Sequence, residues 1–370
     1  MFLGALDIAL LAISFGASAA IGLYHGIKGL NQTSTDYLLG GRRMGALPLA
    51  MSLTVGTVSA ITIMGNAGEM YAHGTQLWVM DVGMALGMYF VAKFFIPIFY
   101  PLKMISLYHV SLGEYWFKCL FLLFELINRR YIQCRFKSTW LRKSTVILTL
   151  SGAYLFIGFL LFPPSLFLKT FTGLSITANI VITGLACSLY SSFGGVKAVV
   201  YTDVLQALIM IVGSLAMVIQ GAHNVGGLDK AWDIAYHHGR IEFFKLSSFN
   251  LDPYQRHSFW LVIVYGFFFS MSTYGVNQSQ TQRTFSTSSV KEAQKVIYYA
   301  IVGMFLLKGL VNLSGIVMFA NFKDCDPLTK DGGPPHNNVL IVVSYVLMHL
   351  TKIPGLAGLF VASIYAAVLR

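Results

Sequence analysis

Long apolar runs recur along the whole chain, and short polar or basic segments separate them. About 20 mostly apolar residues are enough to cross the hydrocarbon core of a bilayer. The pattern therefore predicts an all-α polytopic membrane protein with spanning helices at 5–24, 46–71, 77–100, 145–168, 174–192, 198–220, 258–277 and 296–320. Two further apolar runs, 338–350 and 355–369, are too short to span the membrane alone.

The stretch 48–72 departs from a plain spanning helix because Gly56, Gly65 and Gly68 interrupt it. Its middle is crowded by hydroxyl and amide side chains, at Ser52, Thr54, Thr57, Ser59, Thr62 and Asn66. In lipid such groups must be satisfied within the protein, so this stretch should face the interior, around an unwound turn whose carbonyls could hold a cation. Close helix packing accounts for small residues equally well, and the pattern alone leaves both open.

Composition narrows the class of protein. Of the 370 residues, 56% are hydrophobic and only 11% are charged, against about 25% charged in a soluble domain. We therefore expect a single transmembrane domain over 1–370, with residues 5–24 a retained first helix because no signal-cleavage site follows them. Four cysteines without CxxC spacing predict neither a disulfide framework nor a metal site.

The distribution of Lys and Arg predicts which side each loop faces. Basic residues are concentrated in the loops 25–44, 101–144, 193–197 and 278–295, which places these loops in the cytoplasm and the N-terminus outside. The net charge of +11 thus concerns orientation, and we expect no nucleic-acid partner. The apolar segment 116–128 is short enough to be a non-spanning helix; if it did span, every later loop would change sides.

Charged residues at membrane depth are costly and often functional. Asp81 and Asp203 lie within predicted spans, where a carboxylate hydrogen-bonded to a neighbouring helix is the plain structural alternative. Lys308 lies in the middle of a span without an evident partner, and Lys93 is near enough to a helix end to snorkel. No G-x-S-x-G, P-loop or metal-ligand spacing predicts an enzyme, so Gly194-Gly195 indicates a tight turn.

Several short motifs stand out along the chain. They are GGVKAVVYTDVLQALIM (194–210), DYLLGGRRM (36–44), GTQLW (74–78), KFFIPIFYPL (93–102), GRIEFF (239–244), YGVNQSQTQR (274–283) and KDCDPL (323–328). Together these motifs resemble the sodium/solute symporter family. Their order and spacing match the family across nearly the whole chain. The last two look most like the branch of sodium-coupled monocarboxylate and multivitamin transporters.

The resemblance implies a leucine-transporter-type inverted repeat. Residues 5–24 would be an extra first helix, 46–220 the first five-helix repeat, and 258–370 a partial second repeat. Segment 117–128 looks like an insertion relative to the family. A serine-rich run would follow SIYAAVLR in the family, so the second repeat is expected to be incomplete at Arg370, and this chain alone is not expected to catalyse coupled transport.

The resemblance also implies site residues. Backbone carbonyls of Val55 and Val58 would hold sodium, the co-transported ion, and Asp203 would lie on the cation path. The substrate-facing positions would be Thr62, Asp81, Ser270, Thr273 and Tyr274. Some sugar carriers of the family have aromatic residues at both of the last two positions, so Thr273 argues against a stacked sugar ring.

We therefore expect sodium-coupled symport of a small organic anion, a monocarboxylate or a vitamin-like acid, across the plasma membrane. An ionised Asp81 would repel a carboxylate, so Asp81 is protonated, faces elsewhere, or serves a substrate that is not a simple anion. Two alternatives stay open. One is a truncated, non-transporting family member, and the other is a symporter for another small solute such as a sugar or an inorganic anion. The oligomeric state is not determined by the sequence.

Overall fold

The computed structural model describes residues 4–28, 39–100, 137–173, 175–243, 254, 256–326 and 354–367. Within these ranges the ordered elements are helices, and no strand occurs. They are α1 (Ala5–Lys28), η1 (Gly40–Arg42), α3 (Ala46–Val55), α4 (Ala60–His73), η2 (Thr75–Val79), α5 (Met80–Phe90), η3 (Val91–Phe95), α6 (Ile96–Phe99), α9 (Thr139–Thr172), α10 (Ile176–Val225), α11 (Leu228–His237), α12 (Phe259–Ser270), η7 (Met271–Val276), α13 (Gln278–Thr284), α14 (Val290–Phe322) and α16 (Leu356–Ala366).

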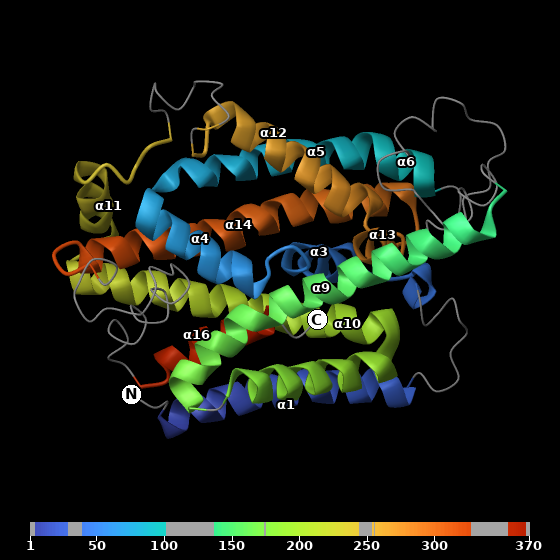
Figure 1. Cartoon of the computed structure of the whole chain (residues 1–370), viewed down its shortest axis with the longest axis horizontal. Helices are drawn as coiled ribbons and strands as arrows, with labels where there is room; N and C mark the ends of the chain where they lie inside the picture. The colour runs from blue at the N-terminus through green and yellow to red at the C-terminus, as the bar shows by residue number, and fades with distance from the viewer. Residues whose placement is uncertain are drawn as a thin grey trace.

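The long helices run roughly side by side in a layered bundle (Figure 1). α5 and α12 pack together along one face, and α1 packs against α10 and α16 at the opposite face. α14 lies between these layers and contacts α3, α4 and α10. Among the residues that the structure describes, five helices are long and apolar enough to span a membrane, and the bent pair α3–α4 makes a sixth candidate span. The described chain is therefore a polytopic helical bundle, as predicted.

The predicted span 46–71 is broken. α3 and α4 meet at an angle of 61° across residues 56–59. Ser59 begins α4 as its N-cap, because its hydroxyl accepts a hydrogen bond from the Thr62 amide at 3.3 Å. A side chain at Gly56 would meet the amide of Gln280 and, at 2.8 Å, the guanidinium of Arg283, so both of these side chains would have to move. The structure shows both features that the sequence left open: the helix is broken, and it is also closely packed, since a side chain at Gly315 of α14 would clash with the Ala67 carbonyl of α4.

α10 contains the predicted tight turn. Gly195 adopts φ 59° and ψ −166°, which L-residues rarely adopt, and the helix doubles back there (Figure 1). The first arm lies beside α1, and the second returns through the bundle (Figure 1). The two helices expected at 174–192 and 198–220 are therefore the arms of one hairpin.

Close helix crossings explain other glycines. Gly83 and Gly87 of α5 face α12, where a side chain on Gly83 would clash with the Ile263 carbonyl and one on Gly87 with the Phe267 carbonyl. Gly266 of α12 allows the same close approach from the other helix, since a side chain added there would clash with the carbonyl of Met80. Such small-xxx-small spacing lets two backbones approach within a membrane.

Some element boundaries were predicted wrongly. The polar segment 221–256, between the predicted spans 198–220 and 258–277, was expected to be a loop. α11 forms in it, with Ala231 and Ala235, one turn apart, fully buried against the bundle. α9 and α14 extend beyond the predicted spans at both ends, since helices commonly continue past the hydrocarbon core. The runs 117–128 and 338–350 lie outside the described residues.

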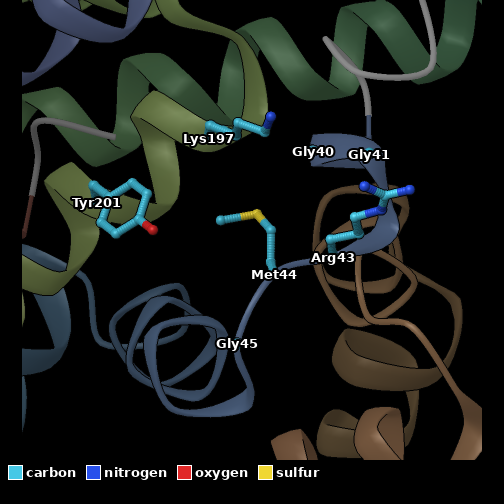
Figure 2. A pocket seen from close by; sticks show the side chains of 7 residues that line it. All are labelled: Gly40, Gly41, Arg43, Met44, Gly45, Lys197 and Tyr201. Atoms are coloured by element: carbon cyan, nitrogen blue, oxygen red, sulfur yellow. The ribbon is translucent and has the colours of Figure 1, made fainter.

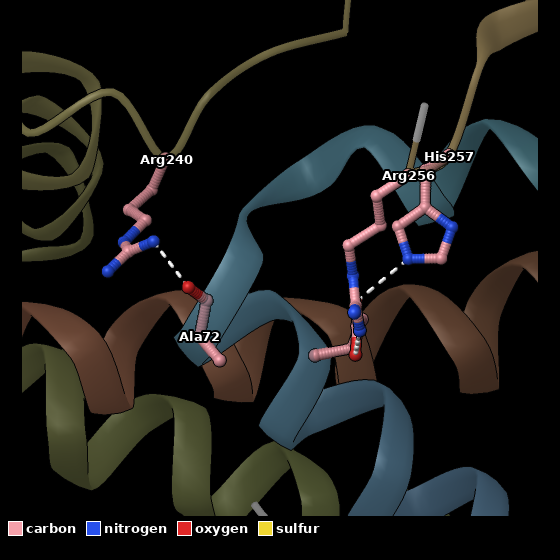
Figure 3. A network of polar contacts seen from close by, with 5 residues as sticks. Ala72, Arg240, Arg256 and His257 are labelled. Carbon is pink, nitrogen blue, oxygen red and sulfur yellow. Dashed lines mark hydrogen bonds and ion pairs between the residues drawn. The ribbon is translucent and has the colours of Figure 1, made fainter. Parts of the chain in front are cut away.

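Two acids that the sequence gave no role hold segments together. Asp7 of α1 accepts a hydrogen bond at 2.7 Å from the amide of Gly358, in the first turn of α16, and so caps that helix from another one. Glu69 of α4 pairs with Arg256 at 2.7 Å and with His257 at 2.8 Å. Figure 3 shows these partners just before α12, and Arg240 donating to the carbonyl of Ala72 nearby.

The two ends of the bundle carry different loops. α6 and α13 lie at one end, and α11 lies at the other, together with the N-terminus (Figure 1). α6 ends and α9 begins at the same end (Figure 1), as required if the segment 116–128 makes no net crossing.

Candidate functional site

The break between α3 and α4 meets a second irregular helix. η7 is a π-helical turn that directly continues α12 and precedes α13. The hydroxyl of Tyr274 lies 2.9 Å from that of Thr57, so η7 is joined to the unwound residues between α3 and α4. Tyr274 is only 2% exposed. Two helices with irregular backbone thus face each other inside the bundle, where unwound backbone can line a cavity.

Asp203 of α10 is fully buried beside this break. Its Oδ2 atom accepts a hydrogen bond from the Ser52 hydroxyl at 2.5 Å and pairs with Arg283 of α13 at 3.4 Å. Arg283 also donates to the Ser52 carbonyl at 3.1 Å. The pair therefore joins three helices at the C-terminal end of α3. The Oδ1 atom of Asp203 is buried and accepts no hydrogen bond from the described part of the chain.

Asp81 of α5 has a partner that the sequence did not reveal. The ammonium group of Lys308, in the middle of α14, donates a hydrogen bond to Asp81 Oδ1. Both side chains are almost fully buried, and the Sδ atom of Met84 lies 3.4 Å from the same ammonium group. One turn farther along α14, the Asn312 amide accepts a hydrogen bond from Asn66 of α4 at 3.4 Å. A polar strip thus runs between α4, α5 and α14.

Val55 and Val58 lie at the break and are fully buried. They share one packed cluster with Ile364 and Tyr365 of α16. The Val55 carbonyl accepts a hydrogen bond from the Val58 amide at 3.0 Å, within a turn that α3 does not continue. A carbonyl has two lone pairs, so it can accept more than one partner.

The remaining predicted substrate-site residues are Thr62, Thr273 and Ser270. Thr62 lies in the first turn of α4, with its hydroxyl 3.2 Å from that of Ser59. Thr273 lies in η7 and is half-buried. Ser270 is fully buried at the α5–α12 crossing, where its hydroxyl donates to the Phe267 carbonyl at 3.0 Å. Its hydroxyl is therefore committed to its own helix and to the packing against α5.

The sequence did not identify Ser52, Thr57 and Arg283 as residues of the polar contacts around the α3–α4 break. Ser52 and Thr57 were visible only as part of a polar cluster, and Arg283 only as the last residue of a motif. Lys308 had been singled out without a partner. Two opposite charges at membrane depth are expected to pair. Asp81 could therefore have been predicted as the partner of Lys308 from the sequence.

The chain matches known transporters over most of its length. The model of the sodium:solute symporter family matches residues 37–370. Sodium-coupled monocarboxylate transporter 2 of Mus musculus is 32% identical over 364 residues, covering 98% of this chain and 54% of that protein. The sodium-dependent multivitamin transporter of Oryctolagus cuniculus is 35% identical over 351 residues, covering 94% and 51%. The sodium/iodide cotransporter of Homo sapiens is 33% identical over 369 residues, covering 99% and 53%.

A solved structure shares the fold. A Na⁺-coupled sialic acid symporter in a substrate-bound, outward-open state superposes with a TM-score of 0.80, at 22% identity. The match covers 99% of this chain and 71% of that one. The fold is thus the leucine-transporter type, and the chain spans about half the length of the curated relatives it matches. By the family match and the shared fold, this chain belongs to the sodium:solute symporter family.

Proposed function

We propose that the protein containing this chain carries out sodium-coupled symport of a small organic anion across the plasma membrane. The contact between Lys308 and Asp81 is the observation that most supports an anionic substrate. Unpaired, Asp81 would repel a carboxylate across a site of low dielectric constant. Paired with Lys308, it adds no net charge, and the ammonium group has one further donor beyond those to Asp81 and Met84. The conflict between an acidic pocket and an anionic substrate is thereby removed.

The polarity of the broken helix supports separate places for the two solutes. The N-terminal end of α4 carries a partial positive charge, and its first turn contains Thr62. A substrate carboxylate would be stabilised there. The C-terminal end of α3 carries a partial negative charge, and Val55 lies at that end. Carbonyls of Val55 and Val58 would supply the hard oxygen ligands that sodium prefers, with Asp203 on the path that the cation follows.

We further infer how the chain is divided. α1 is an extra first helix, residues 46–220 form the first five-helix repeat, and residues 258–370 belong to the second. Relatives that transport monocarboxylates, vitamins and iodide are similar to this chain to nearly the same degree. The half-buried Thr273 and the paired Asp81 favour small carboxylates or vitamin-like acids. Tyr274 would shape the same site directly, whereas Ser270 would act through the packing of α12 against α5.

Uptake measurements test this proposal. The protein is expressed at the surface of cells, and uptake of labelled lactate, nicotinate, biotin and pantothenate is measured with sodium and with choline in its place. We expect uptake of at least one acid to require sodium and to resist competition by glucose. Sodium-driven glucose or iodide uptake that carboxylates do not compete with would contradict the anion assignment. Absence of any sodium-driven uptake, at normal surface expression, would favour a non-transporting family member.

A further inference from the structure

A basic cavity of about 410 Å³ lies apart from the α3–α4 break. It opens between the segment that precedes α3 and the turn of α10 (Figure 2). Its lining residues are Gly40, Gly41, Arg43, Met44, Gly45, Lys197 and Tyr201. Two of the seven are cationic, and among the residues that the structure describes no carboxylate lines it. Neither the sodium site nor the substrate site proposed above uses any of them.

The backbone on one side of the cavity is built in an unusual conformation. Gly40, Gly41 and Arg42 have φ values of 59°, 71° and 53°, so three successive residues are left-handed. A side chain at Gly40 would meet the Met44 sulfur at 2.7 Å, so Met44 would have to move, and it would lie 3.5 Å from Cγ of Lys197. The Met44 amide donates to the Ser286 carbonyl at 3.2 Å, which anchors this segment to the bundle.

The cationic groups come from separate elements. Figure 2 shows Arg43 and Lys197 reaching the same opening, with Gly40 and Gly41 beside them. On the α10 side, the Tyr201 ring stacks on His25 of α1, with ring centres 5.0 Å apart and planes within 1°. Lys28 and Lys197 are both close enough to His25 to act on it electrostatically. Positive charge from α1, α10 and the 40–45 segment is thus gathered in one place.

Exposed apolar side chains flank the lining residues in sequence. Leu47 lies two positions after Gly45 and is 62% exposed. Leu23 and Ile27 lie two positions on either side of His25, which stacks on Tyr201, and they are 52% and 70% exposed. Tyr201 itself is 44% exposed. Large apolar side chains exposed on spanning helices face lipid. The cavity therefore opens where acyl chains and headgroups meet, and a molecule with a phosphate and an acyl chain would fit both parts.

We propose that this cavity binds the phosphate group of an anionic phospholipid, held by Arg43 and Lys197 with Tyr201 as a further donor. Arginine and lysine are the usual phosphate partners in proteins. Basic pockets between transmembrane helices bind the headgroups of such lipids. The Leu23, Ile27 and Leu47 side chains would contact the acyl chains. A free phosphate shares the headgroup's chemistry but would gain nothing from these apolar contacts.

Binding is tested on the purified 370-residue chain in neutral detergent by thermal unfolding. The probes are dioctanoyl phosphatidylinositol 4,5-bisphosphate, dioctanoyl phosphatidylcholine and the soluble inositol 1,4,5-trisphosphate. We expect the phosphoinositide to raise the unfolding midpoint in a saturable manner and the phosphatidylcholine to leave it unchanged. The soluble trisphosphate should bind at least about tenfold more weakly, because it makes no apolar contact. Equal binding of the trisphosphate would overturn the lipid as the source of the phosphate.

Charge-neutral variants locate the site. R43Q/K197Q should weaken phosphoinositide binding by about tenfold or more, since each cation near a membrane surface contributes to anion attraction. The matched control K169Q/K230Q removes two exposed lysines from the opposite end of the bundle and should bind like the unmodified chain. Equal weakening in both variants would overturn the proposal. If R43Q/K197Q does not fold, K197Q alone and the charge-preserving R43K/K197R provide the same comparison, with loss expected only in K197Q.

Discussion

Lys308 of α14 and Asp81 of α5 form a buried ion pair across 227 positions of sequence, in the middle of the helical bundle. The pair joins α5, in the first half of the chain, to α14, in the second half. A lone charge in this place would be costly, whereas the pair satisfies both groups. The stability of the bundle and the charge of the proposed substrate site therefore depend on the same contact.

The first prediction concerns this pair. K308M leaves Asp81 buried without its cation and should destabilise the protein by about 3–5 kcal/mol. D81N/K308M removes both charges and should recover most of that loss. Thermal unfolding in detergent measures both variants, with K93M as the control because Lys93 is exposed. If K308M and K93M unfold at the same temperature, the pair contributes nothing. Sodium-driven uptake should fall in K308M and return in part in D81N/K308M.

The second prediction concerns Asp203. D203N leaves Arg283 buried beside a neutral side chain and should cost about 3–5 kcal/mol. S52A removes only the hydrogen bond to the carboxylate and should cost about 1.5–3 kcal/mol. The control is E292Q, which breaks an exposed pair with Lys295 and should cost about 0–1 kcal/mol. Unfolding midpoints check this order, and an E292Q effect as large as that of D203N would contradict it.

The third prediction concerns the contact between the two irregular helices. Y274F and T57V each remove one side of the hydrogen bond between Tyr274 and Thr57. A double-mutant cycle should give a coupling of about 0.5–1.5 kcal/mol, the net contribution of one such bond. Unfolding free energies provide the cycle, and strictly additive effects would show that the two hydroxyls do not interact. Both variants should also change the KM for the substrate if η7 lines its site.

The fourth prediction concerns the α5–α12 crossing. G87A would push a methyl group into the Phe267 carbonyl and the Ser270 hydroxyl, so we expect a loss of about 1–3 kcal/mol. G16A is the matched control, because Gly16 lies in α1 with open space around it. Alanine there should be neutral or slightly stabilising, since it favours helix more than glycine does. Thermal unfolding decides, and equal midpoints for the two variants would exclude close packing at Gly87.

The fifth prediction concerns orientation. We expect a tag at Met1 to be accessible from outside intact cells, and a tag in 129–143 only after permeabilisation, because the basic loops favour the cytoplasm. Antibody labelling before and after permeabilisation checks both. Labelling of 129–143 from outside would mean that the segment 116–128 spans the membrane and that every later loop changes sides.

The sequence by itself determined the class of protein and most of its helices. The length of an apolar run is enough to predict that a helix crosses the lipid. The spans could therefore be predicted without knowing which helices pack against one another. The glycines and hydroxyls of 48–72 indicated an irregular helix, and Gly194-Gly195 indicated the turn in α10. The motifs determined the family. The bounds of α9 and α14 were less predictable, because helical hydrogen bonds continue into the interfacial region without an apolar signal.

Only the tertiary structure decided which polar groups meet. Lys308 pairs with Asp81, and Ser52 donates a hydrogen bond to Asp203, 151 positions away. Asp7 caps α16 through Gly358, 351 positions away. Each contact depends on which helices are neighbours and on how each is rotated, and local periodicity specifies neither. The pattern shows that a polar side chain must point inward, but the partner is fixed by the packing of glycine-lined crossings such as that of α5 with α12. The charge of the proposed site was therefore a property of the assembled bundle.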